Sequence, residues 1–235
     1  MRCRHYGICT KSARISPLSQ QAHCLSSRFL SDDPAAKVRD CIDLLAKARV
    51  CTKVRHTSGT GVPLEAMRSE KVFKLLYLDV GLAAHVTGLN WSQLAAWSDR
   101  VLVNEGRLAE QFIGQHLLHC HGFQAKPSLH YWLRGGRSAN AEVDFLLACG
   151  SQPVPIEVKA GQSGSLKSLL QYAHIHGPKW AVRYDLNPLS FQPISHGIRT
   201  PDGPAAVNVN LLSIPLYAVE ETLRLLGECD AEFAV

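Results

Sequence analysis

Residues 103–184 carry helix and strand patterns in an order that restricts the fold to a layered α/β architecture. Apolar residues recur first at a helical period and then in short strand-like runs separated by turns. Short turns join the first three strands, which therefore predict an antiparallel meander, and the following helix crosses over to a fourth strand. This order predicts a mixed sheet with helices on both faces. The predicted elements are a helix at 103–121, strands at 129–133, 141–148 and 154–159, a helix at 166–176 and a strand at 180–184.

The segments on either side carry weaker patterns. The segment 32–64 reads as a helix, a short strand and a turn, which fits either the end of a winged-helix module or a generic helix-turn unit. Asp79 follows a buried apolar run and is expected to cap the next helix. The expected elements outside the central region are a helix at 32–50, strands at 52–56 and 72–78, a helix at 80–88, a loop-rich stretch at 188–203, a strand at 207–211 and a helix at 216–227.

The excess of positive over negative charge is confined to the N-terminal segment. The chain of 235 residues has a net charge of +5, and residues 1–31 contain five basic side chains and no acidic one. This segment fits an organellar transit peptide, the irregular start of a gene fragment or a poorly ordered terminus. Since the rest of the chain is neutral, its charge gives no argument for nucleic-acid binding. The expected organisation is a basic tail (1–31), a partial winged-helix-like segment (32–64) and one α/β domain (65–235).

The cysteine spacing and the hydropathy indicate the cellular compartment of the protein. The eight cysteines are scattered and form no Cys-x-x-Cys pair, so zinc-knuckle spacing is absent. Thiols in a reducing compartment are the simplest interpretation. No apolar run approaches the roughly 18 residues that span a bilayer. We therefore expect a cytoplasmic protein with no membrane partner.

Two predicted strands carry acids that point to chemistry. Glu157 and Lys159 alternate with apolar residues and share one strand face, while Glu142 and Asp144 share a face of the preceding strand, with Val143 and Phe145 on the other. If the strands pair, the carboxylates of Asp144 and Glu157 lie side by side. Two such carboxylates repel each other unless a cation lies between them, and their oxygens suit Mg²⁺ or Mn²⁺. Such an ion activates water for phosphodiester hydrolysis, although Glu-x-Lys alone is also common on solvated strands.

Two other groups of residues are weaker candidates. His116 and His119 lie near one helix face beside Cys120, whereas His121 lies off it, so helix-end polar residues explain them as well as zinc does. Aromatic and basic residues near one strand end fit either a nucleic-acid backbone contact or a half-buried strand. These residues are Trp132, Arg134 and Arg137.

The motifs taken together resemble a known family. They resemble the C-terminal region of prokaryotic AAA-type ATPases, domain of unknown function 4143, over about residues 65–220. The resemblance implies a fold of the PD-(D/E)xK nuclease superfamily, with a restriction-endonuclease-like core preceded by a winged-helix segment. The matching motifs are residues 71–82, 110–113, 131–134, 142–145, 156–161 and 165–169.

The resemblance also assigns roles. Glu110 matches the acid of the first core helix, Asp144 that of the second core strand, and Glu157 with Lys159 the Glu-x-Lys of the third. Asp144 and Glu157 are the expected metal ligands. The ATPase domain of the family is missing, and residues 161–168 lack the glycine before the lysine of a Walker A loop, so no ATP binding is expected. Two hypotheses stay open: a Mg²⁺-dependent nuclease acting on DNA, and a non-catalytic remnant that binds nucleic acid or a partner protein.

Overall fold

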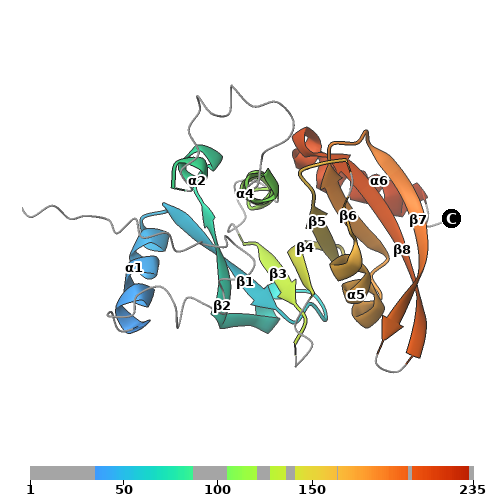
Figure 1. The fold of residues 1–235 in the computed structure, drawn as a ribbon, viewed down its shortest axis with the longest axis horizontal. Helices are drawn as coiled ribbons and strands as arrows, with labels where there is room; N and C mark the ends of the chain where they lie inside the picture. The colour runs from blue at the N-terminus through green and yellow to red at the C-terminus, as the bar shows by residue number, and fades with distance from the viewer. Residues whose placement is uncertain are drawn as a thin grey trace, which may run out of the picture.

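A computed structural model describes residues 35–86, 105–120, 128–135, 141–162, 164–200 and 203–232. These residues form a mixed α/β structure around one eight-stranded sheet (Figure 1). None of the helices in this part of the chain has the length and apolar character needed to cross a bilayer. The N-terminal tail, His121 and Arg137 lie outside the described residues, so the expectations for them stay predictions.

The sheet has the strand order β2-β1-β3-β4-β5-β6-β8-β7. β3, β4 and β5 pair antiparallel as the predicted meander, and β5 pairs parallel with β6 after the crossover through α5. The strands are β1 (Cys51–Thr57), β2 (Arg68–Tyr77), β3 (His130–Leu133), β4 (Glu142–Cys149), β5 (Gln152–Val158), β6 (Trp180–Asp185), β7 (Ser190–Thr200) and β8 (Gly203–Pro215). The helices are α1 (Ala35–Lys47), α2 (Val80–Val86), α4 (Glu105–Leu117), α5 (Lys167–His176) and α6 (Thr222–Glu232), with short 3-10 turns η1 (Leu64–Met67) and η2 (Leu216–Glu221).

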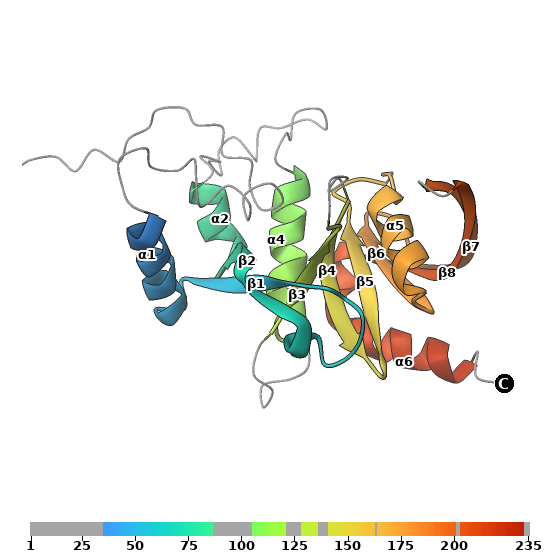
Figure 2. The same cartoon turned by 90° about the horizontal axis from the view of Figure 1, so that it is seen from below.

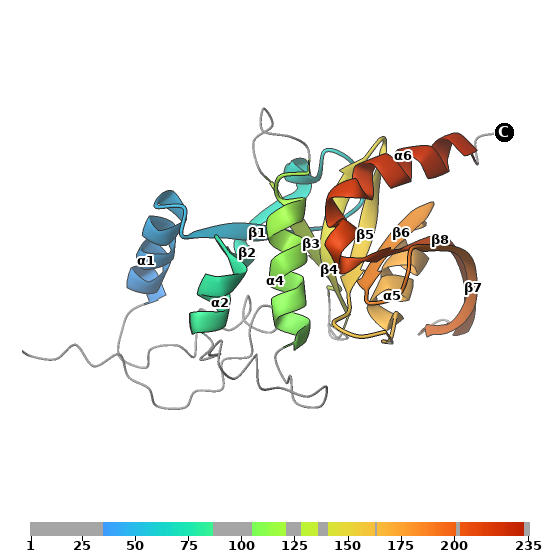
Figure 3. The same ribbon diagram turned by 90° about the horizontal axis from the view of Figure 1, so that it is seen from above.

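Helices cover both faces of the sheet. α5 lies on one face and α6 on the other (Figures 2 and 3). Ile113 of α4 and Leu226 of α6 belong to one buried cluster with Phe145 and Ile156, whereas Leu169 of α5 belongs to a second cluster. The predicted layered architecture is therefore confirmed, and the sheet separates two apolar cores.

A bulge in β4 changes the prediction for that strand. His130 pairs with Leu146, but Trp132, two residues further along β3, pairs with Val143. β4 therefore contains one extra residue at positions 144–145, as in a β-bulge. Val143 packs in a third buried cluster with Trp132 and Leu146, while Phe145 packs in the cluster that contains Ile113 of α4. The expectation that Val143 and Phe145 share a face is wrong, because the extra residue breaks the alternation.

One further expectation needs correction. The stretch 188–203 is not a loop, because β7 occupies most of it and pairs along its whole length with β8. In the segment 32–64, β1 pairs with both β2 and β3, so this strand belongs to the same sheet as the rest of the fold. The N-cap prediction for Asp79 is confirmed, since its carboxylate accepts the Leu82 N–H at 2.7 Å.

Candidate functional site

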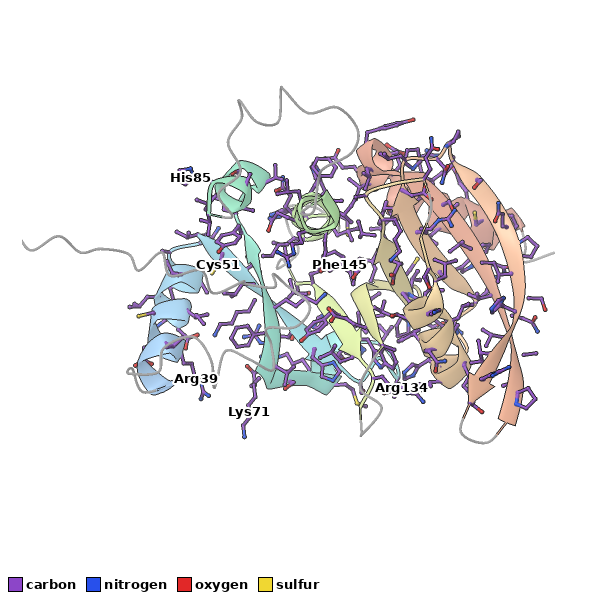
Figure 4. The ribbon with its side chains drawn as sticks, viewed as in Figure 1. Arg39, Cys51, Lys71, His85, Arg134 and Phe145 are labelled. Carbon is purple, nitrogen blue, oxygen red and sulfur yellow. The ribbon has the colours of Figure 1, made fainter. Side chains whose placement is uncertain are left out.

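A buried lysine lies at the centre of the acidic residues. Lys74 of β2 is 3% exposed, and its Nζ lies 2.9 Å from Glu110 Oε1. Nζ also forms an ion pair with Glu142 and lies 3.4 Å from the Asp144 carbonyl oxygen. The rings of Tyr131 and Phe145 face the ammonium at 4.8 and 5.8 Å from their centroids. Phe145 lies beneath α4, in the middle of the molecule (Figure 4).

The close approach of α4 to the sheet places Glu110 over Lys74. A Cβ on Gly114 would lie 2.7 Å from both Leu76 and Phe145, so glycine is needed at this contact. Glu110 lies one turn before Gly114 on the same helix face, and Lys74 lies two residues before Leu76 on the same strand face. Each contact therefore helps to set the geometry of the other.

The other half of the site lies where β4 and β5 separate. The Asp144 carboxylate accepts the Val158 N–H at 2.8 Å, just beyond the last backbone pair, Phe145 with Ile156. Glu157 is 6% exposed and one of its oxygens, Oε1, accepts the Lys159 ammonium. Its second oxygen, Oε2, is buried and has no hydrogen-bond partner in the described part of the chain. A buried carboxylate oxygen of this kind calls for a cation or a donor that the described residues do not supply.

The three glutamate carboxyl groups in this region resist ionisation. Burial, together with the negative charge of Asp144, raises the pKa of Glu157 to about 8. Burial raises the pKa of Glu142 to about 7, even with Lys74 beside it, and also raises the pKa of Glu110. Burial lowers the pKa of Lys74, but Glu110, Glu142 and Asp144 outweigh burial and hold it above its ordinary value. Lys74 therefore stays protonated, whereas the glutamates lack enough neighbouring positive charge to stabilise their ionised forms.

The predicted site residues fall into two neighbouring groups. Oxygens of Glu110, Glu142 and Asp144 lie within 4.8 Å of one another, in a group that does not include Glu157. Glu157 and Lys159 form the second group, as their shared strand face predicts. The electrostatic effect of Asp144 on Glu157 links the two groups.

Sequence reasoning missed Lys74 and Glu142 as members of the site. The signal for Lys74 was a lone lysine inside the apolar run of residues 72–76, because a lysine is rarely buried without a charged partner. Glu142 lies two residues before Asp144, and their shared face was noted without a role for Glu142.

The loop after Lys159 is held against the end of β6. The Asn187 side chain donates to the Gln162 carbonyl oxygen and to the Asp185 carboxylate, at 2.8 Å in each case. The Lys159 N–H donates to the Tyr184 carbonyl oxygen at 2.8 Å. These bonds fix the backbone on which the Lys159 side chain is carried.

The weaker candidates have ordinary contacts. His116 Nδ1 lies 3.0 Å from Glu220, and the described residues contain no His/Cys metal group at this helix end. Trp132 is buried edge-on against Tyr172, and Arg134 donates to Gln171 at 3.1 Å. Zinc at α4 thus gains no support, and Trp132 is a core residue.

The donors suit a hard divalent cation. Carboxylate oxygens are the ligands that Mg²⁺ and Mn²⁺ prefer. The Glu157 oxygen that has no partner among the described residues indicates that a cation or a donor is lacking beside Asp144. The chemistry of these donors therefore suits such an ion.

Fold and site together define an α/β protein with a buried carboxylate and lysine cluster between α4 and strands β2, β4 and β5 of a mixed sheet. The model of the family described as Domain of unknown function (DUF4143) matches residues 105–193. This match includes Glu110, Asp144, Glu157 and Lys159 but not Lys74, which lies earlier in the chain. No curated protein and no solved structure matches the chain.

Proposed function

We propose that this chain is a metal-dependent nuclease-like protein that hydrolyses DNA phosphodiesters. The observation that carries the proposal is the buried Glu157 carboxylate beside Asp144. One of its oxygens accepts the Lys159 ammonium, and the other has no partner among the residues that the structure describes. The element order α4-β3-β4-β5-α5-β6 supports assignment to the restriction-endonuclease-like core of the PD-(D/E)xK superfamily. A cytoplasmic location belongs to the same proposal.

Each residue has a role in the proposed reaction. Asp144 and Glu157 would hold Mg²⁺ or Mn²⁺, which when bound supplies a Lewis acid for the phosphate and lowers the pKa of water. The Lys159 ammonium, held on Glu157, orients the attacking water and stabilises negative charge on the phosphate. Glu110 acts indirectly as a positioning residue. It binds Lys74, whose ammonium contacts the Asp144 carbonyl oxygen.

Plasmid cleavage in Mg²⁺ or Mn²⁺ tests the proposal. Asp144→Asn keeps a side-chain oxygen for the Val158 N–H, so loss of activity would not reflect loss of that hydrogen bond. We expect Asp144→Asn and Lys159→Ala each to lower cleavage by about 100-fold or more. The control is Lys71→Ala, at an exposed lysine that projects away from the sheet (Figure 4). Equal cleavage by all four proteins would contradict a catalytic role.

A second candidate is a non-catalytic module, the remnant of a AAA-type ATPase, that binds nucleic acid or a partner protein. Lys74 favours it, since its ammonium already balances part of the acidic cluster without a metal ion. Calorimetry with Mn²⁺ separates the two candidates. Heat with the wild type but not with Asp144→Asn supports the nuclease, and absence of heat with both favours the binding module.

A further inference from the structure

Lys74 occupies the place where the acidic residues would otherwise gather a cation. Oxygens of Glu110, Glu142 and Asp144 lie within 4.8 Å of one another, a spacing at which they could hold one ion. The Lys74 ammonium contacts the carboxylates of the first two and the backbone carbonyl of the third. An ion bound by all three carboxylates would therefore have to displace this ammonium.

The packing around Lys74 leaves its ammonium no alternative position. The Lys74 side chain is 1% exposed, and the rings of Tyr131 and Phe145 close round it. The tight contact of Gly114 with Leu76 and Phe145 holds α4 and β2 together next to it. Moving the ammonium would leave a buried charge without partners, which is strongly destabilising.

The charges leave room for one divalent ion. The four carboxylates of Glu110, Glu142, Asp144 and Glu157 face two ammonium groups, those of Lys74 and Lys159. With all six groups ionised, their balance is two negative charges. The partly exposed Arg107, which interacts electrostatically with Glu110, offsets at most one of them, so the site still calls for one further cation. Within the described part of the chain, Glu157 Oε2 has no hydrogen-bond partner, and Glu157 lies outside the group that Lys74 contacts.

We infer that Lys74 stands in for a second metal ion, so that the site takes a single divalent cation at Asp144 and Glu157. The inference rests on the proposed function for the first ion, but its claim about Glu110 and Glu142 is separate. Lys74 is thus a positioning residue that keeps the two glutamates in place before any metal binds. Replacing its ammonium with a neutral group opens a second metal position at Glu110, Glu142 and Asp144.

Mn²⁺ stoichiometry tests the inference without an activity assay. Calorimetry should give one Mn²⁺ per chain for the wild type and for the control Lys71→Gln, which changes an exposed lysine of the same strand. Lys74→Gln should bind one Mn²⁺ more than the wild type. Without metal, this variant should melt roughly 10 °C lower than the wild type, and Mn²⁺ should recover part of the loss.

Several outcomes would overturn the inference. They are two Mn²⁺ in the wild type, no additional Mn²⁺ in Lys74→Gln, or a Lys74→Gln protein that fails to fold even when refolded in Mn²⁺. Electron paramagnetic resonance of the Mn²⁺-loaded wild type gives an independent reading, because an isolated ion supports the inference and a spin-coupled pair overturns it. If the wild type binds no Mn²⁺ and Lys74→Gln binds one, the proposed nuclease fails while the role of Lys74 stands.

Discussion

Gly164 lies against the aliphatic stem of Lys159, and a Cβ on Gly164 would stand 2.6 Å from Lys159 Cδ. Gly164→Ala must therefore push the lysine side chain aside and carry its ammonium away from Glu157. We expect DNA cleavage to fall about 10-fold or more, because a displaced catalytic group loses its alignment. The measurement is kcat for plasmid cleavage, with Tm recorded in parallel.

Gly161→Ala is the matched control for Gly164→Ala. A Cβ on Gly161 meets nothing within 4 Å, although this glycine belongs to the same loop. It should retain wild-type activity. Undiminished activity in Gly164→Ala, or an equal loss in both variants, would show that the packing of Lys159 does not govern the reaction.

Asn187 is predicted to hold the loop that carries Lys159. Asn187→Ala removes the hydrogen bonds to the Gln162 carbonyl oxygen and to Asp185. We expect faster amide hydrogen exchange over residues 159–162 and a stability loss of about 1 kcal/mol, the typical net contribution of a hydrogen bond. Asn208→Ala, at an exposed position of β8, is the control. Unchanged exchange in Asn187→Ala would mean that other contacts hold this loop.

The central helices and strands were predicted well because the spacing of apolar residues within each segment determines its structure. The apolar period of residues 166–176 predicts α5, and the compact apolar run Trp180–Tyr184 predicts β6. β7 was missed because it contains Pro193 and Gly197, which are typical of loops. Proline is tolerated there because β7 pairs only with β8, so it forms an edge of the sheet.

The candidate site was only half predictable, because half of it depends on contacts between distant residues. Glu157 and Lys159 are neighbours on one strand, so their pairing follows from alternation alone. Lys74 meets Glu110 across 36 residues of sequence, and no local pattern gives that distance. The bulge at residues 144–145 was equally hidden, since it appears only in the pairing of β3 with β4.

Gly114→Ala is predicted to destabilise the protein despite the better helix propensity of alanine. Its Cβ would lie 2.7 Å from Leu76 and Phe145, both of which are buried and without room to move. Overpacking of this kind costs about 1–3 kcal/mol, against a propensity gain of about 1 kcal/mol. Urea unfolding should show a net loss of about 1 kcal/mol. Gly106→Ala, in the same helix with nothing near its Cβ, should be neutral or stabilising.

Glu157 should make the metal-free protein less stable as the pH rises. Its folded pKa of about 8 lies above the ordinary value of 4.5, so the fold favours the protonated carboxyl. The stabilisation is full below pH 4.5 and is lost as the pH rises through 8. Glu157→Gln imitates the protonated form at every pH. In EDTA, its unfolding free energy should therefore rise relative to the wild type between pH 5.5 and 8.5, by on the order of 2 kcal/mol. Mg²⁺ should reverse the difference by stabilising the ionised wild type alone. Urea unfolding curves at three pH values measure this, and a constant gap between the two proteins would show that Glu157 is ionised in the fold throughout.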